Sequence, residues 1–332
     1  MLKAGVIGIG SMGRNHVRVL AELGALGGYA DADPKVLGEM RGRFGLDGHT
    51  DYRAMLASDI EAVSIATPTE THMQIALDAI AEGKHVLVEK PLAPSLKDAE
   101  RIAAAAERAG VTLAVGMIER HNPVVRFAKA ALEARRFGDL VSLSAKRVSA
   151  FPSRIRDVGA ILDLAIHDLD VMRYLIGSEA KSVFALGGTM GTSRFEDHAN
   201  ILVEFSNGSK GYCEANWLTP MKIRKLILTC TENAVELDYM SQVAEISSSQ
   251  FMSVDLGDLY QTPLEYDIRS VNLKRQEPLR NELSDFLSAA EHGRAPLVTG
   301  RDALKSMRLA LAAVESLRTG RIVTMPDGMS DA

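Results

Sequence analysis

The chain has 332 residues, of which 46% are hydrophobic and 24% are charged, and its net charge is −5. These values are typical of globular proteins with one large or two ordinary domains. The acidic balance gives no support for a nucleic-acid or membrane-surface protein, and no run of about 18 apolar residues predicts a membrane span. Cys213 and Cys230 lack metal-ligand spacing, and we find no pattern of a signal peptide, so we expect a cytoplasmic protein.

A glycine-rich turn opens the chain. An apolar strand pattern runs into Gly8, Gly10 and Gly13, and a helical pattern follows. In such a turn the first glycine permits the tight bend, the second lets the backbone approach a pyrophosphate, and the third lets helix and strand pack closely. With strand and helix both in place, the turn predicts a dinucleotide site. The expected contacts are Gly8, Gly10, Ser11, Met12 and Gly13.

A second predicted strand ends at Asp31, near the spacing expected for the acid that binds a ribose 2′-hydroxyl. Asp33 has its own structural explanation as a helix N-cap before a proline. Two carboxylates here disfavour a 2′-phosphate, so we expect NAD in preference to NADP. Lys35 and Arg14 lie close enough in sequence to leave NADP as the alternative.

Strand and helix patterns then alternate to residue 121, which predicts a doubly wound parallel sheet. Thr67, Pro68 and His72 fall on a loop between a strand and a helix, at the edge where ligands bind, and we expect them to contact the cofactor. For His72, a surface position in the first helical turn fits equally well.

The stretch Val86–Pro91 reads as a buried strand that runs into two charges and a proline. Glu89 and Lys90 then lie at the carboxyl end of that strand, at the ligand edge of the sheet. A lysine held there is a candidate for chemistry. The alternative is a solvated ion pair at a strand end.

These motifs together resemble the Gfo/Idh/MocA oxidoreductases, which include glucose–fructose oxidoreductase and inositol dehydrogenase. The resemblance rests on the segments GIGSMG, TPTETH, GKHVLVEKPLA, GMIERHNP and DLAIHDLD. It implies an α/β protein with a Rossmann domain at 1–121, which binds NAD through residues that include Glu89 and Lys90. It also implies a domain at 122–332 for substrate binding and oligomerisation, with a large, mostly antiparallel open sheet. Relatives associate through that sheet as homodimers or homotetramers, and their lysine–proline peptide is often cis.

The pattern of the second half agrees with that sheet. Strand patterns follow one another closely from residue 182 to residue 239 without crossover helices, which predicts antiparallel pairing. The segment Ser241–Pro278 reads as irregular. Two amphipathic helices close the chain, and the resemblance places the C-terminal helix near the domain junction.

A helical segment at Gly159–Ile176 carries Asp163, His167 and Asp170 on one face. A histidine oriented by a carboxylate is the arrangement that a general base requires. The alternatives are a buried structural His–Asp pair and, less well supported, a metal site that includes Asp170. The resemblance implies catalytic roles for Lys90, Asp163 and His167.

The resemblance also bears on the substrate. We expect Lys90, Arg120, Arg154, Arg156 and His167 to bind it, with the two arginines of the predicted loop suited to a diphosphate. Segments at Arg154–Leu175, Glu196–Phe205 and Asn216–Leu226 resemble the branch of UDP-N-acetylglucosamine 3-dehydrogenases. That branch oxidises the carbon-3 hydroxyl to a 3-keto sugar, which a partner aminotransferase consumes. The alternatives are an inositol or free-sugar dehydrogenase and a non-catalytic NAD-binding sensor.

Overall fold

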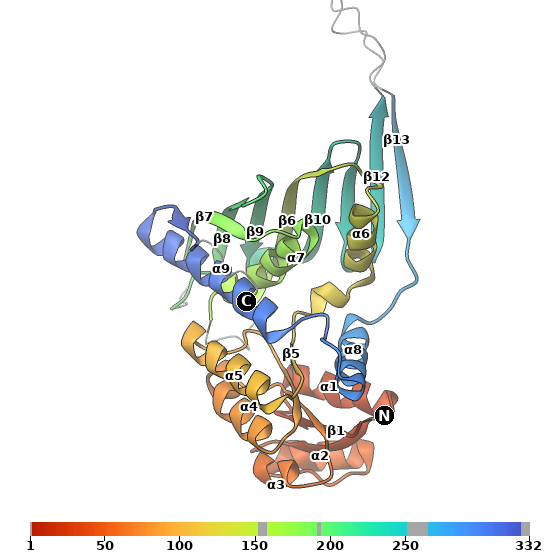
Figure 1. Ribbon diagram of the computed structural model, residues 1–332, viewed down its shortest axis with the longest axis vertical. Coiled ribbons are helices and arrows are strands. Elements are labelled where there is room, and N and C mark those ends of the chain that lie inside the picture. Colours follow the sequence, from red (N-terminus) through yellow and green to blue (C-terminus); the bar gives the residue numbers. More distant parts are fainter. Residues whose placement is uncertain (1, 152–157, 191–193, 251–264, 327–332) are drawn as a thin grey trace, which may run out of the picture. The chain divides into compact units, whose positions relative to one another are not determined.

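Figure 1 shows the protein as a computed structural model, which describes residues 2–151, 158–190, 194–250 and 265–326. The chain divides into two units, Met1–His121 with Glu277–Arg308 and Asn122–Gln276 with Leu309–Ala332. The sequence analysis placed residues 122–332 in one domain, whereas the structure assigns residues 277–308 to the first unit. The physical reason is the apolar stripe of helix α8 (Pro278–His292), because Leu283 and Phe286 are buried in one core with Leu20 of helix α1 (Ser11–Glu22).

Within the described residues, the first unit holds a five-stranded parallel sheet in the order β2-β1-β3-β4-β5. Its strands are β1 Ala4–Ile7, β2 Leu26–Ala30, β3 Ala62–Ile65, β4 His85–Val88 and β5 Leu113–Val115. Its other elements are α2 Pro34–Phe44, α3 Tyr52–Leu56, η1 Thr69–Thr71, α4 His72–Ala81, α5 Leu96–Ala109 and η2 Ile118–His121. Figure 1 shows α4 beside α5, and α1 beside α8. The doubly wound sheet predicted from the sequence is confirmed.

Helices α2 and α5 begin at capping residues, and the sequence predicted the cap of α2 at Asp33. Asp33 Oδ1 accepts a hydrogen bond from the backbone of Lys35 at 2.9 Å, with Pro34 as the first residue of α2. Ser95 Oγ accepts from the backbone of Asp98 at 3.1 Å at the start of α5. These caps satisfy N–H groups that have no partner within the helix, and so they fix where each helix begins.

The second unit is built on a sheet with the strand order β13-β12-β11-β10-β6-β9-β8-β7-β14 among the described residues. Only β6 and β9 pair in parallel in that part of the chain; the other neighbours are antiparallel. The bounds are β6 Leu140–Ala150, β7 Ala180–Gly188, β8 His198–Phe205, β9 Lys210–Asn216, β10 Leu218–Cys230, β11 Ala234–Asp238, β12 Val243–Gln250, β13 Glu265–Asn272 and β14 Val323–Thr324.

Two of these strands correct the sequence interpretation. The segment Ser241–Pro278 was expected to be irregular, but it contributes β12 and β13, which pair along their whole length. The serine-rich β12 has a weak alternation of apolar and polar residues, so its pairing partner and not its own pattern makes it a strand.

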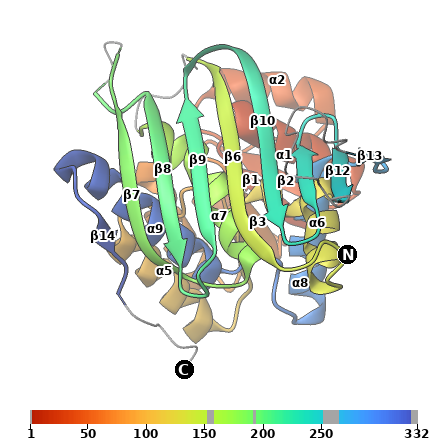
Figure 2. The ribbon, with the colours of Figure 1, turned by 90° about the horizontal axis from the view of Figure 1, so that it is seen from above.

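Helices cover one face of this sheet, as Figure 2 shows for helix α7 (Ile166–Ile176) behind the central strands. The other helices are α6 Pro123–Glu133, the π-helix η3 Ile161–Ala165 and α9 Gly300–Thr319, which spans the division between the units. Arg147 of β6 and Asp168 of α7 form a buried ion pair, with Nε 2.5 Å from Oδ2, that fixes α7 on the sheet. Alternate residues on the opposite face are exposed.

Candidate functional site

The turn between β1 and α1 has the shape that a dinucleotide requires. Gly8 adopts a φ of +87°, which favours glycine. A Cβ at Gly13 would lie 1.8 Å from the carbonyl oxygen of Gly8, so only glycine permits this approach of helix to strand. A Cβ at Gly10 would meet no atom within 4 Å, which leaves open space over the turn. Ser11 and Met12 form the first turn of α1, whose N–H groups favour an anion at this position.

Asp31 lies beside this turn, directly after β2. Its Oδ2 accepts a hydrogen bond from the backbone of Ile9 at 2.6 Å, and its Oδ1 accepts from the backbone of Asp33 at 2.9 Å. The carboxylate is thereby held at the edge of the sheet, where it is suited to a ribose hydroxyl and repels a 2′-phosphate. Arg14 forms an ion pair with Glu39 at 2.8 Å, so one of the two basic candidates for a phosphate already has a carboxylate partner.

A depression of about 280 Å³ lies at the carboxyl ends of β1, β2 and β3. Its lining includes Gly8, Asp31, Thr67 and Pro68, as the sequence predicted for a cofactor site. Sequence reasoning missed the lining residues Thr50, Tyr52 and Ile75. Burial, together with a hydrogen bond from its hydroxyl to Asp78 at 2.7 Å, raises the pKa of Tyr52 to about 12. No motif in the sequence marks these residues, because the fold alone brings them to this edge.

His72 has a different role from both predictions. It is 1% exposed, so it is not a surface histidine. Its Nδ1 lies 3.0 Å from the carbonyl oxygen of Pro91 and its Nε2 lies 2.9 Å from that of Thr67. Burial lowers the pKa of the imidazole. With both ring nitrogens facing backbone carbonyls, His72 ties the β3–α4 loop to the segment after Lys90, and this arrangement does not support a direct cofactor contact.

Lys90 follows β4 and therefore lies at the carboxyl edge of the same sheet as the cofactor turn. The Lys90–Pro91 peptide is cis, as the resemblance implied. The backbone N–H of Lys90 donates to Oε2 of Glu89 at 3.2 Å, and Oε1 of Glu89 lies 3.0 Å from Nε2 of His16. Nδ1 of His16 lies 2.7 Å from Oγ of Ser64. Glu89, expected to contact the cofactor, instead anchors a buried network behind Lys90.

The charge of Glu89 follows from this network. Burial alone would raise its pKa, but the hydrogen bond and charge of His16 and the charge of Lys90 outweigh burial and lower it. Glu282 of α8, 2% exposed, has no hydrogen-bond partner on either carboxyl oxygen among the described residues. Burial and the charge of Glu89 raise its pKa well above 4.5. The pKa values of these two buried carboxyl groups are therefore shifted in opposite directions.

The second unit presents Asp163 and His167 on the segment that leads into α7. Asp163 belongs to the π-helix η3 and His167 to the first turn of α7, and both side chains are partly exposed. Asp170 is fully buried, so it does not share their exposed face as the helical spacing suggested. The described residues contain no group of three or more His, Cys, Asp or Glu side chains that could hold a metal ion.

The remaining substrate candidates have other roles or lie outside the described residues. Arg120 is 3% exposed, and its Nη1 lies 3.4 Å from Oδ1 of Asp302 and 3.4 Å from the carbonyl oxygen of Leu297. Arg120 therefore forms an internal ion pair, and its contact with substrate stays a prediction. Arg154 and Arg156 lie outside the described residues.

Comparison with known proteins agrees with this geometry. Residues 2–117 match the family described as "Oxidoreductase family, NAD-binding Rossmann fold", and residues 125–236 match the "GFO/IDH/MocA C-terminal domain". The chain is 29% identical to UDP-N-acetylglucosamine 3-dehydrogenase of Acidithiobacillus ferrooxidans over 95% of this chain and 98% of that protein. It is 28% identical to the NAD⁺-dependent scyllo-inositol 2-dehydrogenase of Bacillus subtilis, over 98% and 96%. A solved structure of the Acidithiobacillus enzyme superposes with a TM-score of 0.85 at 27% identity, covering 96% of this chain and 98% of that chain. Each helix among the described residues is either too short or too polar to span a lipid bilayer.

Proposed function

The chain belongs to the Gfo/Idh/MocA oxidoreductase family, and from that premise we propose that it oxidises a secondary hydroxyl of a sugar or nucleotide sugar with NAD. The observation that carries the proposal lies within the first unit. The dinucleotide turn at Gly8–Gly13, the carboxylate of Asp31 and the residue Lys90 lie at the carboxyl edge of one parallel sheet. An NAD-binding sensor would have no need of a lysine supported by a buried network at that edge.

The proposed reaction removes a hydride from the carbinol carbon and a proton from its hydroxyl. Bound NAD supplies the acceptor for the hydride. We assign His167 as the base that takes the proton, with Asp163 orienting its imidazole. Lys90 binds the same oxygen and stabilises the negative charge that develops as the carbonyl forms.

For the substrate, we propose the carbon-3 hydroxyl of UDP-N-acetylglucosamine. The support is similarity over nearly the whole chain to a UDP-N-acetylglucosamine 3-dehydrogenase and to its solved structure. Arg154 and Arg156, outside the described residues, would bind the diphosphate by paired hydrogen bonds. The product is a 3-keto sugar, which an aminotransferase would consume. An inositol is the second candidate, favoured by comparable identity to inositol dehydrogenases of Bacillus subtilis and Rhizobium meliloti.

A panel assay tests this assignment. The protein is incubated with NAD and, separately, with UDP-sugars, inositols and free hexoses, and NADH formation is followed by absorbance. Turnover confined to UDP-N-acetylglucosamine supports the first candidate, and turnover confined to inositols replaces it by the second. NADH binding without turnover on the whole panel would make the protein a sensor.

Two variants test the catalytic roles. Lys90→Ala and His167→Ala should each lower kcat by about 10²–10⁴-fold, because the first loses the group that stabilises charge on the oxygen and the second loses the base. His167→Ala should keep NADH binding. Lys97→Ala and His292→Ala remove the same residue types from exposed helical positions and serve as matched controls. Near-native turnover in either test variant removes that residue from the mechanism.

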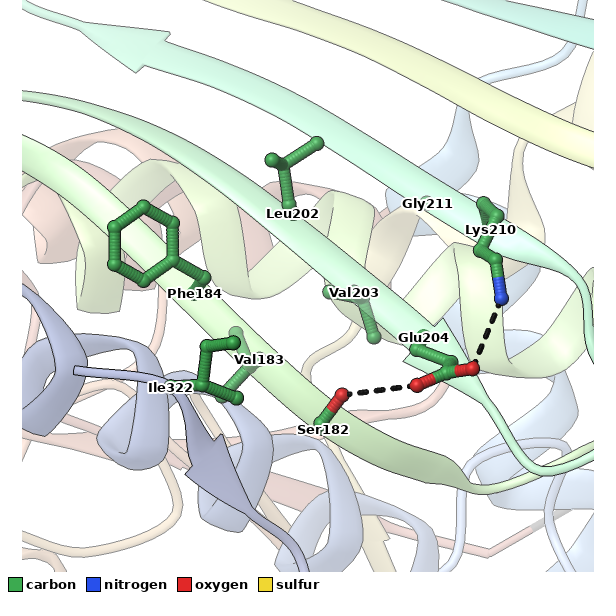
Figure 3. Close-up of a pocket in the computed structure, with 9 residues that line it drawn as sticks. All are labelled: Ser182, Val183, Phe184, Leu202, Val203, Glu204, Lys210, Gly211 and Ile322. Atoms are coloured by element: carbon green, nitrogen blue, oxygen red, sulfur yellow. Dashed lines mark hydrogen bonds and ion pairs between the residues drawn. The ribbon is translucent and has the colours of Figure 1, made fainter.

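We also propose that the open face of the second unit's sheet joins copies of the chain into a dimer or tetramer. Exposed apolar side chains gather on strands of this face: Leu186, Leu202, Ile227 and Ile268 are 58%, 54%, 40% and 57% exposed. Figure 3 shows Phe184, Leu202 and Ile322 around a depression of about 430 Å³, beside the hydrogen-bonded group Ser182, Glu204 and Lys210. An apolar surface of this kind marks an interaction site. Leu202→Arg should lower the mass measured by light scattering, whereas Arg108→Glu on α5 should not; an unchanged mass for Leu202→Arg counts against this interface.

A further inference from the structure

The helix that carries the proposed base begins in an unusual way. Ile161–Ala165 form a π-helix, and α7 continues from Ile166. π-helical turns are rare and are frequent at functional sites. Asp163 lies in the π-helical turn and His167 follows it, so the geometry of this turn sets the direction of the carboxylate relative to the imidazole.

One distant residue holds the first turn of this helix. The backbone N–H of Ile161 donates to Oε1 of Glu196 at 3.0 Å, and the backbone N–H of Ala160 donates to the carbonyl oxygen of Glu196 at 2.9 Å. N–H groups at a helix start have no partner within the helix, and Glu196 satisfies two of them. Its carboxylate also complements the positive end of the helix dipole.

Gly159 is shaped to receive this carboxylate. A Cβ at Gly159 would lie 2.1 Å from Oε1 and 2.2 Å from Oε2 of Glu196, so any larger residue would displace the side chain. The two residues therefore form a matched contact between the segment before η3 and the segment before β8.

The segment that carries Glu196 is itself anchored. Asp197 is 1% exposed, and its Oδ2 accepts a hydrogen bond from the backbone of Met190 at 2.8 Å. Its Oδ1 lies 2.8 Å from Nδ1 of His198, and its backbone N–H donates to Gly188 at 3.0 Å. Burial raises the pKa of Glu196, with the charge of Asp197 adding to it and the hydrogen bond from Ile161 opposing it. Burying a carboxyl group costs free energy unless hydrogen bonds compensate for the lost water. The hydrogen bond from Ile161 supplies such compensation for Glu196.

We propose that Glu196, seated against Gly159, is a positioning residue that fixes the π-helical turn and thereby holds Asp163 and His167 in their working orientation. This inference rests on the proposed function, because that function assigns Asp163 and His167 to one proton-transfer step. Glu196 then joins Lys90, Asp163 and His167 as a residue on which oxidation of the sugar hydroxyl depends.

Four variants separate positioning from simple stability: Glu196→Ala, Glu196→Gln, Gly159→Ala and the double variant of Gly159→Ala with Glu196→Ala. Glu196→Ala should lower kcat by about 10²-fold, because displacing a catalytic group by about 1 Å slows a reaction by about that factor. The KM for NAD should not change, and the acid limb of the kcat–pH profile should shift. Glu196→Gln keeps an acceptor oxygen for Ile161 and should stay close to wild type.

Gly159→Ala should lower kcat because its methyl group collides with the carboxylate. The double variant should be no worse than Glu196→Ala alone, since the collision needs the glutamate. Multiplying effects in the double variant would contradict the matched contact. A loss of thermal stability in Glu196→Ala with unchanged kcat and pH profile would overturn the proposal.

The wild-type substrate panel distinguishes this failure from failure of the proposed function. If no compound on the panel is oxidised, the function fails, and the inference is then tested by NMR titration of the His167 imidazole in wild type, Glu196→Gln and Glu196→Ala. A titration midpoint that moves in the alanine variant and is kept in the glutamine variant supports positioning. Equal midpoints in all three overturn it.

Discussion

For His16→Ala, the structure allows a magnitude to be given for the loss in free energy of unfolding. It removes the imidazole that lies 3.0 Å from Glu89 and 2.7 Å from Ser64, with His16 itself fully buried. Removing one partner of a buried ionised group costs about 3–5 kcal/mol, since the charge left behind is uncompensated. Ser64→Ala deletes only the hydrogen bond between the Ser64 hydroxyl and the imidazole of His16 and should cost about 1 kcal/mol. The first variant should therefore lose several times as much stability as the second.

The assay is urea unfolding followed by circular dichroism, with amide exchange of Glu89 as the local reporter, since that N–H donates to the carbonyl oxygen of Ile65 at 2.9 Å. The difference between wild type and His16→Ala should depend on pH. Because the folded-state pKa of Glu89 is lowered, its stabilisation is present above pH 4.5 and is lost as the pH falls through the folded value. In the variant the hydrogen bond and charge of His16 no longer offset burial, and only Lys90 still favours the ionised form of Glu89. Protonation of Glu89 then relieves part of the penalty, so the difference should shrink toward acid pH. A loss for His16→Ala no greater than for Ser64→Ala would refute the reasoning.

Three further predictions concern the first unit. Gly13→Ala should abolish NADH binding in fluorescence titration, because its Cβ would lie 1.8 Å from the carbonyl oxygen of Gly8, whereas Gly38→Ala, with no atom within 4 Å, should bind normally. Asp31→Ser should weaken NAD binding by about 10–100-fold, as loss of a charged hydrogen bond does, and should raise the ratio of NADP to NAD turnover; an unchanged ratio contradicts the role of the carboxylate. Glu282→Gln should be more stable than wild type at neutral pH. Since the pKa of Glu282 is raised in the folded state, that advantage should grow as pH rises above 4.5, and a pH-independent difference would count against a neutral buried acid.

The parts of the fold that the sequence predicts are those set by local chemistry. The glycine turn, the caps at Asp33 and Ser95 and the apolar run before Glu89 each carry their structural cause within a few residues. The strand β12 does not, because its serines show little alternation and depend on β13 for pairing. The placement of α8 in the first unit depends on which core its apolar stripe meets, and amphipathic periodicity alone cannot specify that core.

The site was predictable to a similar extent. Motif spacing identifies Lys90, Asp31 and the turn as residues of one sheet edge. The resemblance assigned Glu89 to the cofactor, and the position of His72 on a strand-to-helix loop assigned it there too. The structure places both residues in internal hydrogen bonds. A motif residue can hydrogen-bond the backbone segment that carries a functional group, or it can contact the cofactor directly. The sequence alone does not distinguish these two roles. The contact of Glu196 with the helix start joins residues 35 positions apart and has no local signal.

The most direct test of the account is a crystal structure of the protein with NADH and UDP-N-acetylglucosamine, a pairing that cannot react in the forward direction. We predict that Nζ of Lys90 and a ring nitrogen of His167 each lie within about 3.2 Å of one sugar hydroxyl oxygen, with the nicotinamide against the carbon that bears it. A complex in which either side chain neither contacts that oxygen nor reaches it through one bridging water would contradict the account.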